Sequence, residues 1–211
     1  MIPVKVLAVR YLSSVPEALR KALGTEEACL GLLTTDCDDA TYIALDQATK
    51  DAQVTVCYGR SFYAGAGNAT SPYAGEVLGI LAGPTPGAVR SGMESALREL
   101  ERVGFEDLSG VPCLAHTVSR CGSFLAKEAG VPEGTPLAYL IAPPLESMYA
   151  LDAALKAADV KLCKLYTPPT ETNFGGGLLT GTQSACAAAC AAFRETVAEV
   201  AGRPNKERYD G

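Results

Sequence analysis

Small apolar side chains recur every four residues in two places along the chain, and this spacing predicts two helices. The recurring residues are Ala44, Ala48 and Ala52 in one place and Ala150, Ala154 and Ala158 in the other. Residues four apart share a face of a helix, so each helix can lie close to a sheet along a narrow row of small side chains. In both helices an aspartate precedes a lysine by four residues, and this pairing slightly favours a helix.

Short apolar segments with a β-like composition flank the two helices and predict strands. The flanking segments are residues 30–34 and 54–58 in the first half and residues 137–141 and 160–166 in the second. Each half continues with another predicted strand, at 76–82 or 178–180, and an amphipathic helix that we expect to dock on a sheet. The apolar faces of these later helices are Val89, Met93, Ala96, Leu97 and Leu100 in the first half and Cys186, Cys190, Phe193, Val197 and Val200 in the second.

The two halves repeat one another in sequence. Residues 44–57 return as residues 150–163 at an offset of 106, half of the 211-residue chain, and residues 4–8 return more weakly as 111–115. A period this long indicates a duplicated domain-sized unit rather than a solenoid repeat. The predicted parts are a first domain at 1–105, a second domain at 106–203 and a loose polar tail at 204–211.

The charge balance argues against two classes of partner. The formal net charge is −6 and Lys and Arg form no cluster, whereas proteins that bind nucleic acid or anionic membranes carry basic patches. Hydrophobic residues make up 48% and charged residues 20% of the chain, the balance of a soluble globular protein. The most apolar stretch, residues 77–82, is far shorter than the roughly 18 residues of a membrane span. We expect no nucleic acid or membrane partner and a location in the cytosol.

Cysteine and histidine show no spacing typical of a metal site or a catalytic group. Eight cysteines are spread through apolar segments without an export signal, which favours reduced, buried thiols over disulfides. No Cys-x-x-Cys or His-x-x-x-His spacing of a zinc site is present. We expect the one histidine, His116, to be structural, and the chain to bind no metal and no cofactor.

Glycine-rich loops follow the repeated segments, at 63–72 and 168–177. Neither loop has the strand, loop and helix context of a phosphate or dinucleotide site. Flexible turns are the favoured interpretation of the glycines. The alternative is a pore at which backbones without side chains come together.

Carboxylates gather in one half of the chain only. Asp36, Asp38 and Asp39 lie between a predicted strand and a predicted helix, and Glu76 begins the next strand. One interpretation is that Asp38 or Asp39 caps the helix. A cap needs one carboxylate, so the alternative is a recess that binds an amine or a metal cation. The second half has Pro-Pro-Leu-Glu at 143–146 instead, so such a site would belong to the first half.

The repeated helices resemble the signature of a known family. Both contain Ala-Leu-Asp-x-Ala-x-Lys-x-Ala-x-Val, which is similar to the signature helix of bacterial microcompartment shell domains. Further motifs resemble those of tandem-domain shell proteins of the ethanolamine-utilisation type, at 36–42, 58–66, 74–77, 142–146 and 168–174. The resemblance implies an α/β (α+β) fold of two tandem, circularly permuted microcompartment domains. Each domain would be a small, mostly antiparallel sheet flanked by helices.

The resemblance also implies a structural role rather than catalysis. In that family three chains close into a flat pseudohexamer. The pseudohexamers tile, together with other shell proteins, into the shell of an organelle in the cytoplasm, and gated pores pass small molecules such as ethanolamine. Flat tiling needs complementary edges. The resemblance makes Lys50 and Lys156 the candidate edge residues.

In this family ethanolamine binds in a small pore between the two domains of each chain. Carried over by motif, the ligand-binding residues are Asp38, Asp39, Glu76, Phe105, Thr172, Asn173 and Phe174. The acids would bind the ammonium group, and Thr172, Asn173 or backbone groups would bind the hydroxyl.

Two other functions stay open from the residues alone. A carboxylate-dependent enzyme would use Asp38, Asp39 and Glu76 as acid and base. A soluble amine sensor would also suit a duplicated α/β domain. A shell protein would differ from both in forming two-dimensional arrays.

Overall fold

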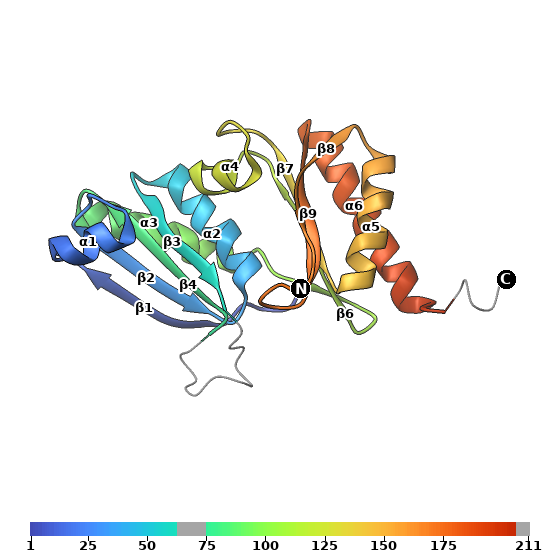
Figure 1. Ribbon diagram of the computed structural model, residues 1–211, viewed down its shortest axis with the longest axis horizontal. Helices are drawn as coiled ribbons and strands as arrows, with labels where there is room; N and C mark the ends of the chain where they lie inside the picture. The colour runs from blue at the N-terminus through green and yellow to red at the C-terminus, as the bar shows by residue number, and fades with distance from the viewer. Residues whose placement is uncertain (63–74, 206–211) are drawn as a thin grey trace. The chain divides into compact units, whose positions relative to one another are not determined.

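The computed structural model describes residues 1–62 and 75–205, and the chain divides into two compact units (Figure 1). The N-terminal unit comprises Pro3–Gly104 and Cys121–Glu128. The C-terminal unit comprises Met1–Ile2, Phe105–Arg120 and the residues from Ala129 onward. These units are defined by compactness, whereas the predicted domain limits 1–105 and 106–203 come from the sequence repeat. The domain limits therefore stay a proposal.

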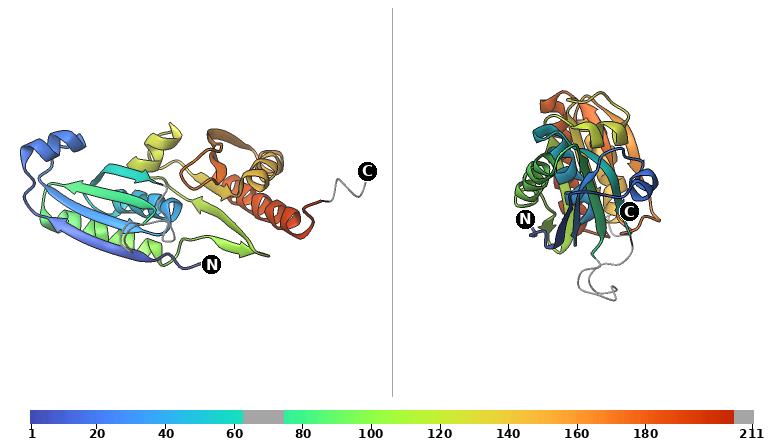
Figure 2. Two further views of the ribbon diagram at one scale, coloured as in Figure 1. Left: turned by 60° about the horizontal axis from the view of Figure 1, so that its bottom comes forward. Right: turned by 90° about the vertical axis from the view of Figure 1, so that its left-hand side faces the viewer.

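The N-terminal unit is built on a four-stranded antiparallel sheet in the order β1-β2-β4-β3. Its strands are β1 (Val6–Leu12), β2 (Cys29–Thr35), β3 (Thr55–Ser61) and β4 (Val77–Gly83). The unit also contains the helices α1 (Glu17–Leu23), α2 (Asp38–Asp51) and α3 (Pro86–Leu100). Helices α2 and α3 pack against each other and on the sheet. The two views of Figure 2 show α1 and α3 on opposite sides of this sheet.

Small side chains bring α2 close to the sheet. Ala44 and Ala48 are fully buried, as is Leu45 between them. From α3, Met93 and Ala96 are fully buried too. The predicted row of alanines therefore faces the interior, where the absence of larger side chains lets the helix approach the strands.

The C-terminal unit repeats this plan with one additional strand. Its antiparallel sheet has the order β5-β6-β7-β9-β8. The strands are β5 (Glu106–Leu108), β6 (Val111–Val118), β7 (Leu137–Ala142), β8 (Val160–Tyr166) and β9 (Gly175–Gly181). Helices α5 (Pro144–Ala157) and α6 (Gln183–Gly202) pack on each other and on the sheet. Phe193 of α6 is fully buried in the core of this unit.

The predicted fold class is confirmed, since each unit is an antiparallel sheet flanked by helices. The prediction did not include α1, α4 (Ser123–Ala129) or β5, and it named no strand at β1 or β6. The two helices have seven residues each and β5 has three, which is too short for hydrophobic periodicity to stand out. The loop at 63–72 and the tail residues 206–211 lie outside the described residues.

The flexible-turn interpretation of the glycines at 175–177 is wrong, because these residues begin strand β9. Gly176 has a φ of 150°, and a Cβ atom added to it would lie 1.8 Å from the carbonyl oxygen of Leu140. Glycine is needed here because the neighbouring strand leaves no room for a side chain. The glycines at 65 and 67 lie outside the described residues.

The cysteines are reduced, as the sequence predicts, whereas the structural role of His116 stays a prediction. All eight cysteines are free thiols, and five of them are buried. His116 lies on β6 opposite Tyr139 of β7. Among the described residues, no three His, Cys, Asp or Glu side chains are grouped so that they could hold a metal ion. The described helices include none with the length and apolarity to cross a membrane.

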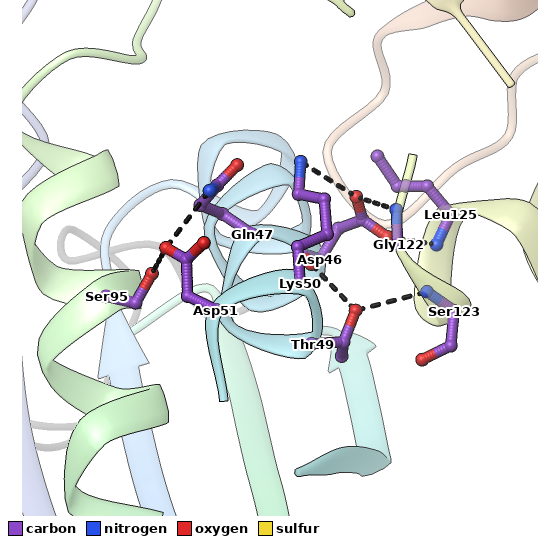
Figure 3. Close-up of polar contacts among 9 residues, drawn as sticks. All are labelled: Asp46, Gln47, Thr49, Lys50, Asp51, Ser95, Gly122, Ser123 and Leu125. Atoms are coloured by element: carbon purple, nitrogen blue, oxygen red, sulfur yellow. Dashed lines mark hydrogen bonds and ion pairs between the residues drawn. The ribbon is translucent and has the colours of Figure 1, made fainter. Parts of the chain in front are cut away.

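A buried carboxylate connects α4 to α2 within the N-terminal unit (Figure 3). Asp46 is fully buried. Its carboxylate accepts hydrogen bonds from the backbone N–H groups of Gly122 at 2.7 Å and Leu125 at 2.8 Å. The hydroxyl of Thr49 accepts a further bond from the N–H of Ser123 at 3.1 Å. Residues from the second half of the sequence are in this way fixed to a helix of the first half.

Replacement of Asp46 by alanine leaves two buried N–H groups without their acceptor. We expect Asp46→Ala to lower the free energy of unfolding by about 3 kcal/mol, because each unsatisfied buried donor is costly. Urea unfolding followed by circular dichroism measures this change. Asp159→Ala, at an exposed aspartate, is the control and should change the free energy of unfolding by less than about 0.5 kcal/mol. Equal losses in the two variants would contradict a special role for Asp46.

Candidate functional site

The predicted acidic cluster lies where β2 ends and α2 begins. Asp38 and Asp39 occupy the first turn of α2, and each is only 7% exposed. Asp36 accepts a hydrogen bond from the backbone N–H of Lys5 at 2.7 Å. Glu76 lies beside the end of β2, where its N–H donates to the carbonyl of Thr35 at 2.8 Å. The structure therefore brings together all four carboxylates that the sequence singled out in the first half.

The helix cap is Cys37 and not an aspartate, so the interpretation of Asp38 or Asp39 as the cap is wrong. Two threonine hydroxyls hold this turn in place of a capping carboxylate. The N–H of Cys37 donates to the hydroxyl of Thr35 at 3.1 Å, and the hydroxyl of Thr41 donates to the carbonyl of Cys37 at 2.8 Å. The two hydroxyls lie 2.8 Å apart. The carboxylates are thus not needed as the cap.

Burial and mutual repulsion alter the protonation of this cluster. Burial, with added repulsion from Asp38 and Asp36, raises the pKa of Glu76 from 4.5 to about 7. Burial is also the main cause that raises the pKa of Cys37, and Asp39 raises it further. Near neutral pH Glu76 is therefore close to half protonated. A cation that binds beside it would relieve the repulsion and favour its charged form.

The predicted aromatic residues form a pair in the C-terminal unit. The ring centroids of Phe105 and Phe174 are 5.7 Å apart at an interplanar angle of 67°, an edge-to-face contact. Just before Phe174, Asn173 has a left-handed backbone with φ 59°. The hydroxyl of Thr170 donates to the carbonyl of Phe174 at 2.8 Å and closes this turn. Thr172 is half-buried and Asn173 is exposed in the same turn.

The seven predicted ligand residues thus form two local groups, one in each unit. Asp38, Asp39 and Glu76 belong to the N-terminal unit. The others, Phe105, Thr172, Asn173 and Phe174, belong to the C-terminal unit. Their action on one ligand stays a prediction.

The two candidate edge lysines differ in their surroundings. The Lys50 side chain is 24% exposed, and its Nζ lies 3.6 Å from the Asp46 carboxylate (Figure 3). The Lys156 side chain is 75% exposed and pairs with Asp152 at 2.6 Å, and Asp152 is itself 60% exposed. In the sequence both pairs appear only as similar i, i+4 contacts. The buried role of Asp46 could not be recognised there, because its backbone partners lie more than 70 residues away.

The raised pKa of Glu76 predicts a pH-dependent effect of Glu76→Gln on stability. A carboxyl whose pKa is higher in the folded chain stabilises it fully below its ordinary pKa of 4.5. That contribution is lost as the pH rises through about 7. The melting temperature of Glu76→Gln should therefore rise relative to the unchanged protein between pH 5 and pH 8. Thermal unfolding across this range measures the difference, and Glu133→Gln, at an exposed glutamate, should show none. A difference that does not vary with pH would contradict the raised pKa.

Comparison with known proteins places this geometry in a family. Residues 29–110 match the model of the BMC domain. Over 206 residues the chain is 58% identical to the bacterial microcompartment shell protein EutL of Clostridium perfringens (strain 13 / Type A). This match covers 94% of both chains.

Solved structures show the same fold. The crystal structure of ethanolamine utilization protein EutL from Leptotrichia buccalis C-1013-b is similar at a TM-score of 0.93, with 56% identity and 96% of each chain covered. The trimeric bacterial microcompartment shell protein PduB is similar at a TM-score of 0.77 and 20% identity, covering 94% of this chain and 90% of PduB. At that identity the second likeness concerns the fold alone. From the matches to EutL, the chain belongs to the EutL family of bacterial microcompartment shell proteins.

Proposed function

We propose that the chain forms homotrimers in the shell of an ethanolamine-type microcompartment and binds ethanolamine on its passage through that shell. Members of the EutL family are named as shell proteins, so the role is structural and not enzymatic. The observation that carries the binding proposal is the acidic cluster of the N-terminal unit. A half-buried carboxyl with a pKa of about 7, next to the buried Asp38 and Asp39, is suited to an ammonium group.

The repeat supports a trimer as the assembly. Two similar domains in each of three chains give a ring with six nearly equivalent positions. The relative PduB, which shares the fold, is described as trimeric. A ring of this kind can tile a flat layer with other copies and with other shell proteins.

For the ligand we propose two sets of contacts. Asp38, Asp39 and Glu76 bind the ammonium group through charge-assisted hydrogen bonds. Thr172 and Asn173 bind the hydroxyl, and the rings of Phe105 and Phe174 contact the methylene groups or the cation. The sequence supports placing the ammonium contacts in the first half. The counterpart of the acidic turn in the second half is Pro-Pro-Leu-Glu, which lacks the aspartates.

For assembly into layers we propose Lys50 and Lys156 as contacts at the edges of the trimer. Both lysines stand at the same position of the repeated helix. The ammonium group of Lys156 is exposed beside Asp152, and the Lys50 side chain retains partial exposure beside Asp46. Each lysine can then donate to a neighbouring trimer while its aspartate holds the side chain in position.

Ethanolamine binding is tested by isothermal titration calorimetry. Glu76→Gln should weaken binding about tenfold, since a charge-assisted hydrogen bond contributes about 1.5 kcal/mol or more. In the unchanged protein the affinity should fall as the pH is lowered from 8 to 6, because Glu76 takes up a proton. Glu133→Gln should bind as the unchanged protein does. If Glu76→Gln binds ethanolamine at pH 8 as tightly as the unchanged protein does, the Glu76 carboxylate is not part of the binding site.

Layer formation is tested by electron microscopy of concentrated protein. The double variant Lys50→Ala, Lys156→Ala should remain trimeric in solution and lose the two-dimensional sheets that the unchanged protein forms. Lys127→Ala, at an exposed lysine of another helix, should form sheets normally. Sheets from the double variant would contradict the role of these lysines. Discrete oligomers from the unchanged protein at every concentration would favour a soluble sensor instead.

A further inference from the structure

Tyr42 lies one turn along α2 from the two acids that begin this helix. Asp38 and Asp39 precede it by four and three residues, so the three side chains lie on neighbouring positions of one helix face. Tyr42 is half-buried. Burial is the main cause that raises the pKa of its hydroxyl, and the charges of Asp38 and Asp39 raise it further. The Tyr42 hydroxyl therefore keeps its proton and lies close enough to the acidic cluster to sense its charge.

The Tyr42 hydroxyl connects α2 to the last residue of β3. It makes hydrogen bonds with the hydroxyl and the backbone of Ser61. Ser61 pairs with Val77 at the start of β4. One residue further, the N–H of Phe62 donates to the carbonyl of Glu76 at 2.9 Å. The hydroxyl therefore joins the helix that carries two of the acids to the strand end at which the third acid lies.

The ring of Tyr42 has a separate contact, with α4. The centroids of the Tyr42 and Phe124 rings are 5.8 Å apart, and the rings are tilted by 44°. Phe124 also covers Gly59 of β3, where an added Cβ atom would lie 3.1 Å from the phenylalanine ring. Phe124 thus contacts both the tyrosine and the strand. The ring of residue 42 can keep this place when only its hydroxyl is removed.

The second half of the chain folds without this hydroxyl contact. At the offset of 106 residues, Met148 stands in place of Tyr42 and Thr167 in place of Ser61. Methionine has no hydroxyl, and Met148 is 45% exposed. The second sheet nevertheless has the same strand pairing, and α5 packs on it. The half that lacks the acidic turn also lacks the tyrosine, so the fold itself does not require the contact.

We propose that Tyr42 and Ser61 position the acidic cluster by holding the start of α2 at a fixed distance from Glu76. The inference rests on the ethanolamine site proposed above and adds two residues that act through the acids. One ammonium group can bind carboxylates of both elements only if their oxygens lie about 3 Å from its nitrogen. The carboxylates repel one another, which favours separation of the two elements before the cation binds. A hydrogen bond between the elements opposes this separation, so less binding free energy is lost in bringing the acids together.

Removal of the hydroxyl tests the contact. Tyr42→Phe keeps the ring against Phe124 and should weaken ethanolamine binding about fivefold in isothermal titration calorimetry, as expected for the loss of a hydrogen bond. Ser61→Ala should weaken binding too, and it should have no further effect in the Tyr42→Phe protein, because both changes remove the same contact. Tyr149→Phe, at an exposed tyrosine, should bind as the unchanged protein does. Circular dichroism checks that each variant is folded.

A double-mutant cycle with Glu76→Gln distinguishes positioning of the acids from a general effect on the fold. In the Glu76→Gln protein, Tyr42→Phe should change the affinity less than about twofold, because no carboxylate remains on the strand for α2 to approach. An equal loss of affinity in both proteins would overturn the positioning role. If Glu76→Gln weakens binding and Tyr42→Phe does not, the positioning role is wrong and the proposed function stands. If the unchanged protein binds no ethanolamine, both are wrong.

Discussion

The N-terminal unit depends on one buried carboxylate. Asp46 has no exposure to solvent, and burial raises its pKa. The N–H groups of Gly122 and Leu125, followed by the ammonium group of Lys50, partly offset this effect. A buried charge without such partners would be very costly. Asp46 therefore keeps the backbone of α4 in contact with α2 in the folded unit. A segment of the second half of the sequence is thereby made part of the first compact unit.

The equivalent aspartate in the second half, Asp152, is 60% exposed. Asp152 and Lys156 keep the sequence of the signature helix but have no α4-like partner on the helix face beside them in the described chain. One motif is therefore used in two ways, with its aspartate buried under α4 in the first half and exposed in the second half.

Much of the fold could be predicted from the sequence, because the long elements have strong periodicity. The alanine rows of α2 and α5 and the apolar face of α3 identified helices that the structure contains, and the repeat identified the duplication. The short helices α1 and α4 could not be found in this way, and the partners of Asp46 are distant in sequence. At the site, the gathering of Asp36, Asp38, Asp39 and Glu76 was predictable from their spacing around one strand and helix. The threonine hydroxyls that replace an aspartate cap were not, because any of several polar residues could have capped α2.

The acidic turn of the first half is replaced by Pro-Pro-Leu-Glu in the second half. The repeated segments form the helices and strands that both halves share, whereas the turn at 36–39 and the turn at 168–174 distinguish the two domains chemically. The most direct test of ethanolamine binding in a shell trimer is a crystal structure of the chain grown with saturating ethanolamine. We expect a trimer with the ligand nitrogen about 3 Å from a carboxylate oxygen of Glu76, Asp38 or Asp39. A trimer with ethanolamine bound only elsewhere, or with none bound, would contradict it.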